Sequence, residues 1–137
     1  MIASAATILY VDDNVRSRRL LGSILIDCGF EVVGTGDSAD AIREFSKFRF
    51  DGALIDYRMP IMSGPDLALK LKTLHPDVPV VMLSGAAVLT DKELLCVDVH
   101  FGAGTSLHDL LSTLRTLTCS QPARPIRAAA VSWHEAT

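Results

Sequence analysis

The chain has 137 residues, 49% of them apolar, and its 13 Lys and Arg against 16 Asp and Glu give a net charge of −3. This length suits one domain with its own core, and the high apolar content excludes a largely disordered chain. The acidic balance argues against direct nucleic-acid binding, because neutralising phosphates requires clustered basic residues. The local basic group of Arg16, Arg18 and Arg19 is predicted to be the solvated face of a helix.

Cysteine spacing and the N-terminal sequence indicate the cellular compartment. Cys28, Cys96 and Cys119 lie far apart, which predicts reduced, mostly buried thiols and neither a disulfide framework nor a zinc site. The N-terminus fails the signal-peptide pattern, and no apolar run approaches the roughly 20 residues of a membrane span. We therefore expect a cytoplasmic protein.

Short apolar runs rich in β-branched residues alternate with longer segments along the chain. Their continuous hydrophobicity is typical of parallel strands that are buried on both faces. The predicted strands cover residues 7–11, 30–34, 53–56, 78–83 and 97–101.

The segments between these runs show helical periodicity. The first apolar stripe, with the arginines off it and Gly29 as a stop signal, consists of Leu20, Leu21, Ile24, Leu25 and Cys28. Similar stripes predict helices in 41–48, 67–74 and 107–117, and 87–96 is the weakest helix candidate because Thr90 and Asp91 interrupt it. Alternating strands and helices predict an α/β fold: a doubly wound, five-stranded parallel sheet with helices on both faces and strand order 2-1-3-4-5.

The last twenty residues differ in composition from the rest. Residues 118–137 contain Pro122, Pro125 and the single tryptophan, Trp133. They are predicted to form a flexible C-terminal tail that can include a short helix from Ala128, and a second domain is the less favoured alternative. The folded domain is expected to span residues 1–117.

Acidic residues follow the predicted strands at one edge of the sheet. Ligands of open parallel sheets bind beyond the carboxyl ends of the strands. Asp12 and Asp13 follow the first strand, Asp56 ends the third, and Ser84 follows the fourth. If strands one and three are neighbours, the three carboxylates converge.

Three converging carboxylates have a chemical consequence. They require a raised pKa or a bound cation, and hard oxygen ligands favour Mg²⁺. A carboxylate beside a divalent ion is suited to accept a phosphoryl group, and Asp56 is the best nucleophile candidate. A single aspartate in such a place is more often a helix cap or a turn residue, but three of them together with Ser84 make that alternative less favoured.

Four stretches of the chain carry a family resemblance. They are ILYVDDN at 8–14, ALIDYRMP at 53–60, MSG at 62–64 and VVMLSG at 80–85. In this order and spacing they resemble the receiver domains of two-component response regulators, which have a flavodoxin-like fold. The resemblance assigns residues 1–117 to a receiver domain.

The resemblance implies a role for each matching residue. Asp56 would take a phosphoryl group from a histidine kinase or phosphotransfer protein, and Ser84 would be the switch hydroxyl that turns towards it. Asp12, Asp13, Asp56 and the backbone carbonyl of Arg58 would bind Mg²⁺. Gly64 would shape the turn after Asp56, and Arg58 and Ala86 would tune the lifetime of the acyl phosphate. Activity beyond self-catalysed transfer to and from Asp56 is not expected, and the output would be contact with a downstream protein.

The end of the fifth strand departs from the family pattern. The family has Lys followed by Pro there, whereas this chain has Ala103 and Gly104 and no lysine in 101–105. Three carboxylates and one Mg²⁺ leave a formal charge of −1, which the lysine would cancel. We predict weaker phosphoryl retention or weaker coupling, which Ala103→Lys should correct, with Arg58 as a hypothetical substitute cation.

Two further departures lie nearby. His100 stands where the family has a rotating aromatic residue, although a half-exposed histidine at a strand end is the simpler interpretation. The stretch from Ser84 to Ala103 is also about three residues shorter than usual, nearly one helical turn.

These features leave two principal hypotheses. One is a stand-alone receiver that is phosphorylated on Asp56, and the other is a pseudo-receiver that binds partners without phosphorylation; a homodimer is open in both. A small phosphatase is less favoured because the Asp-x-Asp pattern is missing at Asp56. A dinucleotide-binding loop at 34–39 is also disfavoured, since Asp37 and Asp40 would repel a pyrophosphate.

Overall fold

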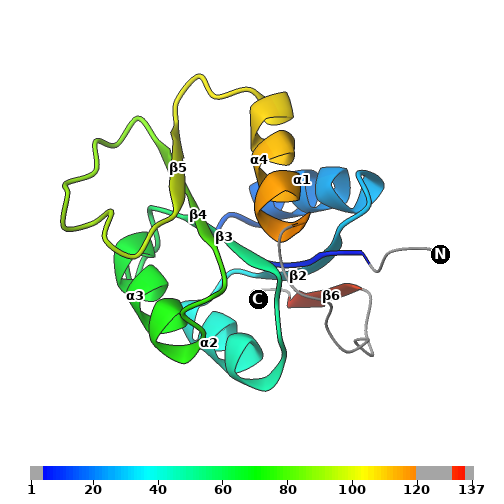
Figure 1. Cartoon of the computed structure of the whole chain (residues 1–137), viewed down its shortest axis with the longest axis horizontal. Coiled ribbons are helices and arrows are strands. Elements are labelled where there is room, and N and C mark those ends of the chain that lie inside the picture. Colours follow the sequence, from blue (N-terminus) through cyan, green and yellow to red (C-terminus); the bar gives the residue numbers. More distant parts are fainter. Residues whose placement is uncertain (1–4, 120–130, 135–137) are drawn as a thin grey trace.

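The computed structural model describes residues 5–119 and 131–134 (Figure 1). Its helices are α1 (Val15–Asp27), α2 (Ser38–Lys47), α3 (Gly64–Leu74) and α4 (Leu107–Cys119). Its strands are β1 (Thr7–Val11), β2 (Glu31–Thr35), β3 (Gly52–Asp56), β4 (Val80–Gly85), β5 (Val99–Gly102) and β6 (Val131–His134). The strand predictions are therefore confirmed to within one or two residues at each end.

The strands form one parallel sheet with the order β5-β4-β3-β1-β2-β6. This confirms the predicted order 2-1-3-4-5 for the first five strands. In Figure 1 α1 and α4 cover one face of the sheet, and α2 and α3 cover the other. No helix in the described part of the chain is long and apolar enough to span a membrane.

Two hydrophobic cores sandwich the sheet. One lies under α2 and α3 and contains Leu9, Phe45 and Ile55. The other lies under α1 and α4 and contains Tyr10 and Leu54. Because successive side chains of a strand point to opposite faces, β1 and β3 contribute to both cores, which explains their unbroken apolar sequences.

Side-chain caps determine where the helices begin. Asn14 caps α1 by accepting the N–H of Ser17 at 2.9 Å, and Ser63 caps α3. Asp37 caps α2 by accepting the N–H of Ala39 at 2.7 Å. A carboxylate thus occupies the helix N-terminus where a bound phosphate would lie, which agrees with the exclusion of a dinucleotide loop at 34–39.

The prediction of a helix at 87–96 is wrong. After β4 the chain makes only a short turn, in which the N–H of Leu94 bonds to the Thr90 carbonyl at 3.1 Å, and it then enters β5. Further along the segment, the N–H groups of Leu95 and Val97 bond only three residues back, to the carbonyls of Lys92 and Leu94. Without successive bonds from residue i to residue i−4, the turn does not propagate as an α-helix. The described part of the chain therefore has four helices, not five.

The tail prediction also needs correction. Thr118 lies inside α4, which runs to Cys119. Val131–His134 add a sixth strand parallel to β2 within the segment predicted to be a flexible tail with a short helix. The rest of the predicted helix from Ala128 lies outside the described residues. An exposed sheet edge offers unpaired N–H and C=O groups, which explains why β2 can accept this strand.

The apolar stripe of α1 is narrower than predicted. Leu20 is 65% exposed and therefore lies outside the core, whereas Leu25 is fully buried. Gly29 follows the helix with a φ of +101°, which confirms its role as the stop signal. Cys28 and Cys96 are free thiols that are only half-buried, where mostly buried thiols were predicted.

Candidate functional site

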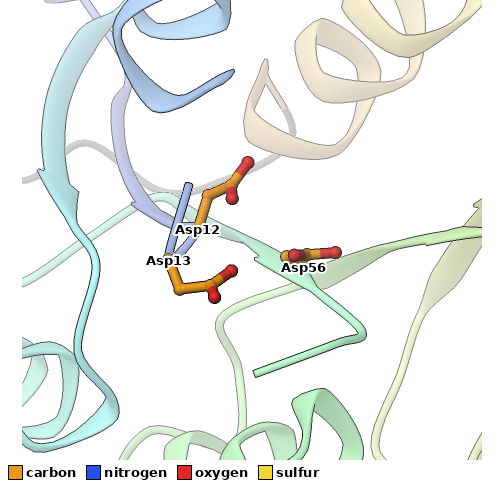
Figure 2. A group of neighbouring side chains, drawn as sticks. All are labelled: Asp12, Asp13 and Asp56. Atoms are coloured by element: carbon orange, nitrogen blue, oxygen red, sulfur yellow. The ribbon is translucent and has the colours of Figure 1, made fainter. Parts of the chain in front are cut away.

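Three carboxylates meet at the carboxyl ends of β1 and β3. Because Val11 pairs with Ile55, Asp12 and Asp56 follow at adjacent strand ends. One carboxylate oxygen from each of Asp12, Asp13 and Asp56 lies within 4.8 Å of the other two (Figure 2). The convergence predicted from the sequence is therefore present in the structure.

Asp12 is held in place by two hydrogen bonds. Its side chain is 6% exposed, and its Oδ2 accepts from the hydroxyl of Tyr10 at 2.8 Å. Its Oδ1 accepts the main-chain N–H of Asn14 at 3.0 Å. Burial, and secondarily the charge of Asp12, raise the pKa of Tyr10, so this phenol stays a neutral donor. Tyr10 was not among the predicted site residues, although a residue two positions before Asp12 on a strand shares its face.

Arg18 is part of this end of the sheet and not of a solvated helix face. It is only 2% exposed, and its Nη1 donates to the main-chain carbonyl of Asp12 at 2.7 Å. The prediction of a solvated position followed from the charge of Arg18 and did not consider its spacing from the apolar residues of α1. Arg18 precedes Leu21 and Leu25 by three and seven positions and therefore shares their buried stripe.

Asp56 has an altered acidity. Burial is the largest cause that raises its pKa, from 3.8 to about 6, and the charges of Asp12 and Asp13 raise it further. Hydrogen bonds from the main-chain N–H groups of Arg58 and Tyr57 act in the opposite direction. Like-charge repulsion in the cluster is therefore not fully compensated by the protein's own groups.

This donor set fits a hard divalent cation. All three side chains offer carboxylate oxygens, which Mg²⁺ prefers while it retains several waters. A dication would also offset the charges of Asp12 and Asp13, which add to the effect of burial in raising the pKa of Asp56. Asp12, Asp13 and Asp56 would hold the ion, and the contribution of the Arg58 carbonyl stays a prediction.

The loop after Asp56 returns close to the end of β3. The N–H of Gly64 bonds to the carbonyl of Tyr57 at 2.9 Å. A Cβ at position 64 would lie 2.6 Å from Sδ of Met82 and 2.7 Å from the carbonyl oxygen of Asp56. Only glycine fits such an approach, which supports the predicted role of Gly64 in shaping this turn.

Comparison with known proteins decides the family. The sequence model of the response regulator receiver domain matches residues 8–100. The chain belongs to the response regulator receiver domain family. This match includes all three aspartates and Ser84, and it ends before Ala103.

Two curated relatives place this receiver in its sequence family. It is 34% identical over 79 residues to the autoinducer 1 sensor kinase/phosphatase LuxN of Vibrio campbellii, covering 58% of this chain and 9% of LuxN. It is 33% identical over 89 residues to the transcriptional regulatory protein PrrA of Mycobacterium leprae, covering 65% of this chain and 38% of PrrA. The match thus spans well under half of either relative.

A solved structure agrees on the fold. The receiver domain of a sensor histidine kinase from Pseudomonas aeruginosa, crystallised with a magnesium ion coordinated in its active site cleft, superposes with a TM-score of 0.74. The alignment covers 85% of this chain and 99% of that one at 22% identity, so it shows a shared fold.

The remaining predicted site residues lie on or beside β4 and β5. Ser84 is 4% exposed, and its hydroxyl donates to the carbonyl of Phe101 on β5 at 3.3 Å. Four other positions are exposed to solvent and are not part of the acidic cluster: Arg58, Ala86, His100 and Ala103. Their tuning and switch roles stay predictions.

The fifth strand of this receiver ends in small residues. Gly102, Ala103 and Gly104 follow one another, and the main-chain N–H of Ala103 bonds to the carbonyl of Gly85 at 2.6 Å. Gly104 has a φ of +87°, which favours glycine. Residues 99–107 contain no Lys or Arg, so the family's ammonium has no replacement in this segment.

A hydrogen bond that the sequence analysis missed connects the loop after Asp56 to the turn before β5. The hydroxyl of Tyr57 donates to Oε2 of Glu93 at 2.7 Å. Oε1 of Glu93 accepts the N–H of Thr90 at 2.9 Å, and the N–H of Glu93 bonds back to the Thr90 hydroxyl. The Thr-x-x-Glu spacing is a capping-box signal that could have indicated this turn.

Proposed function

We propose that this receiver accepts a phosphoryl group on Asp56 from a histidine kinase or phosphotransfer protein and acts as a stand-alone cytoplasmic regulator through protein contacts. The observation that carries the proposal is the cluster of Asp12, Asp13 and Asp56 at the ends of two buried strands. The match to the receiver family over residues 8–100 supports it.

The proposed step is transfer between two protein side chains. A carboxylate oxygen of Asp56 attacks phosphorus as the P–N bond of a phosphohistidine breaks, and the released imidazole takes up a proton. Bound Mg²⁺ would neutralise charge on the transferred oxygens. Asp56 must be ionised to attack, and with a pKa of about 6 most of it is ionised at neutral pH.

The main contribution of the protein's own groups is to orient the carboxylates of the cluster before transfer. Asp12 is fixed by Tyr10 and Asn14, so the cluster needs little rearrangement before transfer. Because the acyl phosphate is a state of the protein itself, we propose a phosphorylated regulator and not an enzyme acting on a separate substrate.

The second candidate function is a pseudo-receiver that binds partners without phosphorylation. Two observations favour it: Ala103 replaces the phosphate-pairing lysine, and the Ser84 hydroxyl is bonded to Phe101 of β5. In that case the acidic cluster would be retained without accepting a phosphoryl group.

Intact-mass measurement separates the two candidates. The protein is incubated with Mg²⁺ and a small phosphodonor such as acetyl phosphate, beside Asp56→Asn. We expect the mass of one phosphoryl group to be added to the wild type and not to the variant. Unlabelled wild type, or equal labelling of both proteins, would contradict the proposal, and the unlabelled case would favour the pseudo-receiver.

A further inference from the structure

A pocket of about 330 Å³ opens at the carboxyl ends of β4 and β5, on the face of the sheet that α1 and α4 cover. None of the residues that line it carries a charge. Its apolar walls are Leu21 of α1, Leu83 of β4, Phe101 of β5, and Leu107 and Leu110 of α4. The pocket is therefore bounded by the elements around the position of the missing lysine.

The floor of the pocket continues to the acidic cluster. Asp56 pairs with Leu83, and Leu83 pairs with Phe101, so the three residues form one row across β3, β4 and β5. Paired residues of neighbouring parallel strands point to the same face and lie about 4.8 Å apart. The side chain of Asp56 is thus one strand away from the pocket and on its side of the sheet.

Part of the pocket lining is glycine and so carries no side chain. Gly85 and Gly102 line it, and Ala103 and Gly104 follow directly. His100 does not fill it, because it pairs with Met82, which packs in the opposite core. The pocket therefore has an uncharged lining, and Leu83 in its wall lies beside Asp56 of the acidic cluster.

From this charge complementarity we infer that the pocket receives a lysine side chain from a partner protein. Lysine combines an apolar stem with a charged end, and such side chains bury the stem while the ammonium reaches a polar site. The stem would lie over Leu83 and Phe101, and the ammonium would pair with Asp56. The inference rests on the proposed function and supplies in trans the cation that position 103 lacks.

The surroundings of the pocket favour a protein over a free amine. Leu107, one of the apolar walls of the pocket, is 42% exposed. Exposed apolar side chains beside a pocket are typical of protein-binding surfaces. A partner that inserts a lysine would cover Leu107, whereas a small amine would leave it in water.

The inference is tested with beryllofluoride and Mg²⁺, which imitate the phosphoryl group. Binding is followed by fluorine NMR with and without n-butylammonium, which has the four carbons and the ammonium of a lysine side chain. At constant ionic strength, we expect n-butylammonium to strengthen beryllofluoride binding by roughly two- to fivefold, the range for a partly exposed ion pair. Butan-1-ol is the uncharged control and should have no effect.

Ala103→Lys is the matched variant, since its own ammonium should fill the site. It should bind beryllofluoride without the amine and show no response to it. If Ala103→Lys binds but the wild type ignores n-butylammonium, the inference is overturned and the proposed function stands. If neither protein binds beryllofluoride under any condition, the proposed function fails as well.

A peptide distinguishes a partner protein from a free amine. A blocked tripeptide with lysine between two leucines should act at lower concentrations than n-butylammonium, because it can also cover Leu107. The norleucine version of the peptide should be inactive. Equal potency of the lysine peptide and the amine would overturn the assignment to a protein partner.

Discussion

The β1–β3 half and the β4–β5 half of the sheet contribute unequally to the site. In the first, two fully buried strands end in three carboxylates, and Asp12 is held by hydrogen bonds. In the second, β5 alternates between half-buried and exposed residues, and Ala103 and Gly104 follow its last residue, Gly102. No helix lies between β4 and β5. The contrast indicates that the proposed phosphoacceptor chemistry depends on the buried half, whereas the other half can change without loss of the fold.

Gly64→Ala should have the largest effect on stability, because it disturbs the buried half. The new Cβ would lie under 3 Å from Met82 and from the main chain at Asp56 and Tyr57. We expect a loss of about 3 kcal/mol in the free energy of unfolding, at the upper end of the cost of overpacking. Urea denaturation measures it.

Gly104→Ala is the matched control in the other half. Position 104 has a φ of +87° but nothing within 4 Å of an added Cβ. Only the backbone conformation is penalised, so the loss should be about 1 kcal/mol. Equal losses in the two variants would contradict the distinction between a tightly packed and a permissive half.

Asp56→Asn should stabilise the metal-free protein at pH 7.5. The folded state raises the pKa of Asp56 to about 6, so the ionised carboxylate is disfavoured on folding. We expect a gain of about 1 kcal/mol, reduced from the full shift because Asp56 is half-exposed to solvent.

The raised pKa of Asp56 determines how its contribution to folding stability changes with pH. The Asp56 contribution favours folding when the carboxyl is protonated, below about pH 4, and is lost as the pH rises through 6. The advantage of Asp56→Asn should therefore vanish towards pH 4, and Mg²⁺ should reverse it at pH 7.5 by stabilising only the wild type. An advantage independent of pH and Mg²⁺ would contradict a charge-repelled cluster.

Tyr57→Phe should have the smallest effect, because it removes one hydrogen bond between the two halves. Without the bond to Glu93, we expect amide exchange in residues 87–97 to accelerate by roughly two- to tenfold, while exchange in β1 and β3 stays unchanged. Glu93→Ala should match it, and the double variant should add little. Unchanged exchange in all three would show that the bond does not hold the turn.

The buried half was the more predictable from sequence. Strands buried on both faces leave continuous apolar runs, and carboxyl ends of parallel strands share one edge, so the convergence of Asp12, Asp13 and Asp56 followed from topology. Arg18 was misassigned because its charge outweighed its place on the buried stripe of α1.

Local sequence periodicity was not sufficient to predict the structure of the β4–β5 half. The segment 87–96 carries a capping signal at Thr90 and Glu93, yet the main-chain bonds that follow span only three residues and do not extend the turn into an α-helix. The pairing of Val131–His134 with β2 is a contact between distant segments, which local pattern does not encode. The pocket beside Phe101 depends in the same way on how α1, α4 and the sheet pack together.

The most direct test of the central claim compares the phosphorylated fraction of the wild type, Ala103→Lys and Asp56→Asn, all with Mg²⁺ and acetyl phosphate. If the acceptor half is intact and only the cation is missing, the wild type is labelled weakly, Ala103→Lys several-fold more, and Asp56→Asn not at all. Equal labelling of the wild type and Ala103→Lys, or any labelling of Asp56→Asn that matches the wild type, would contradict the account.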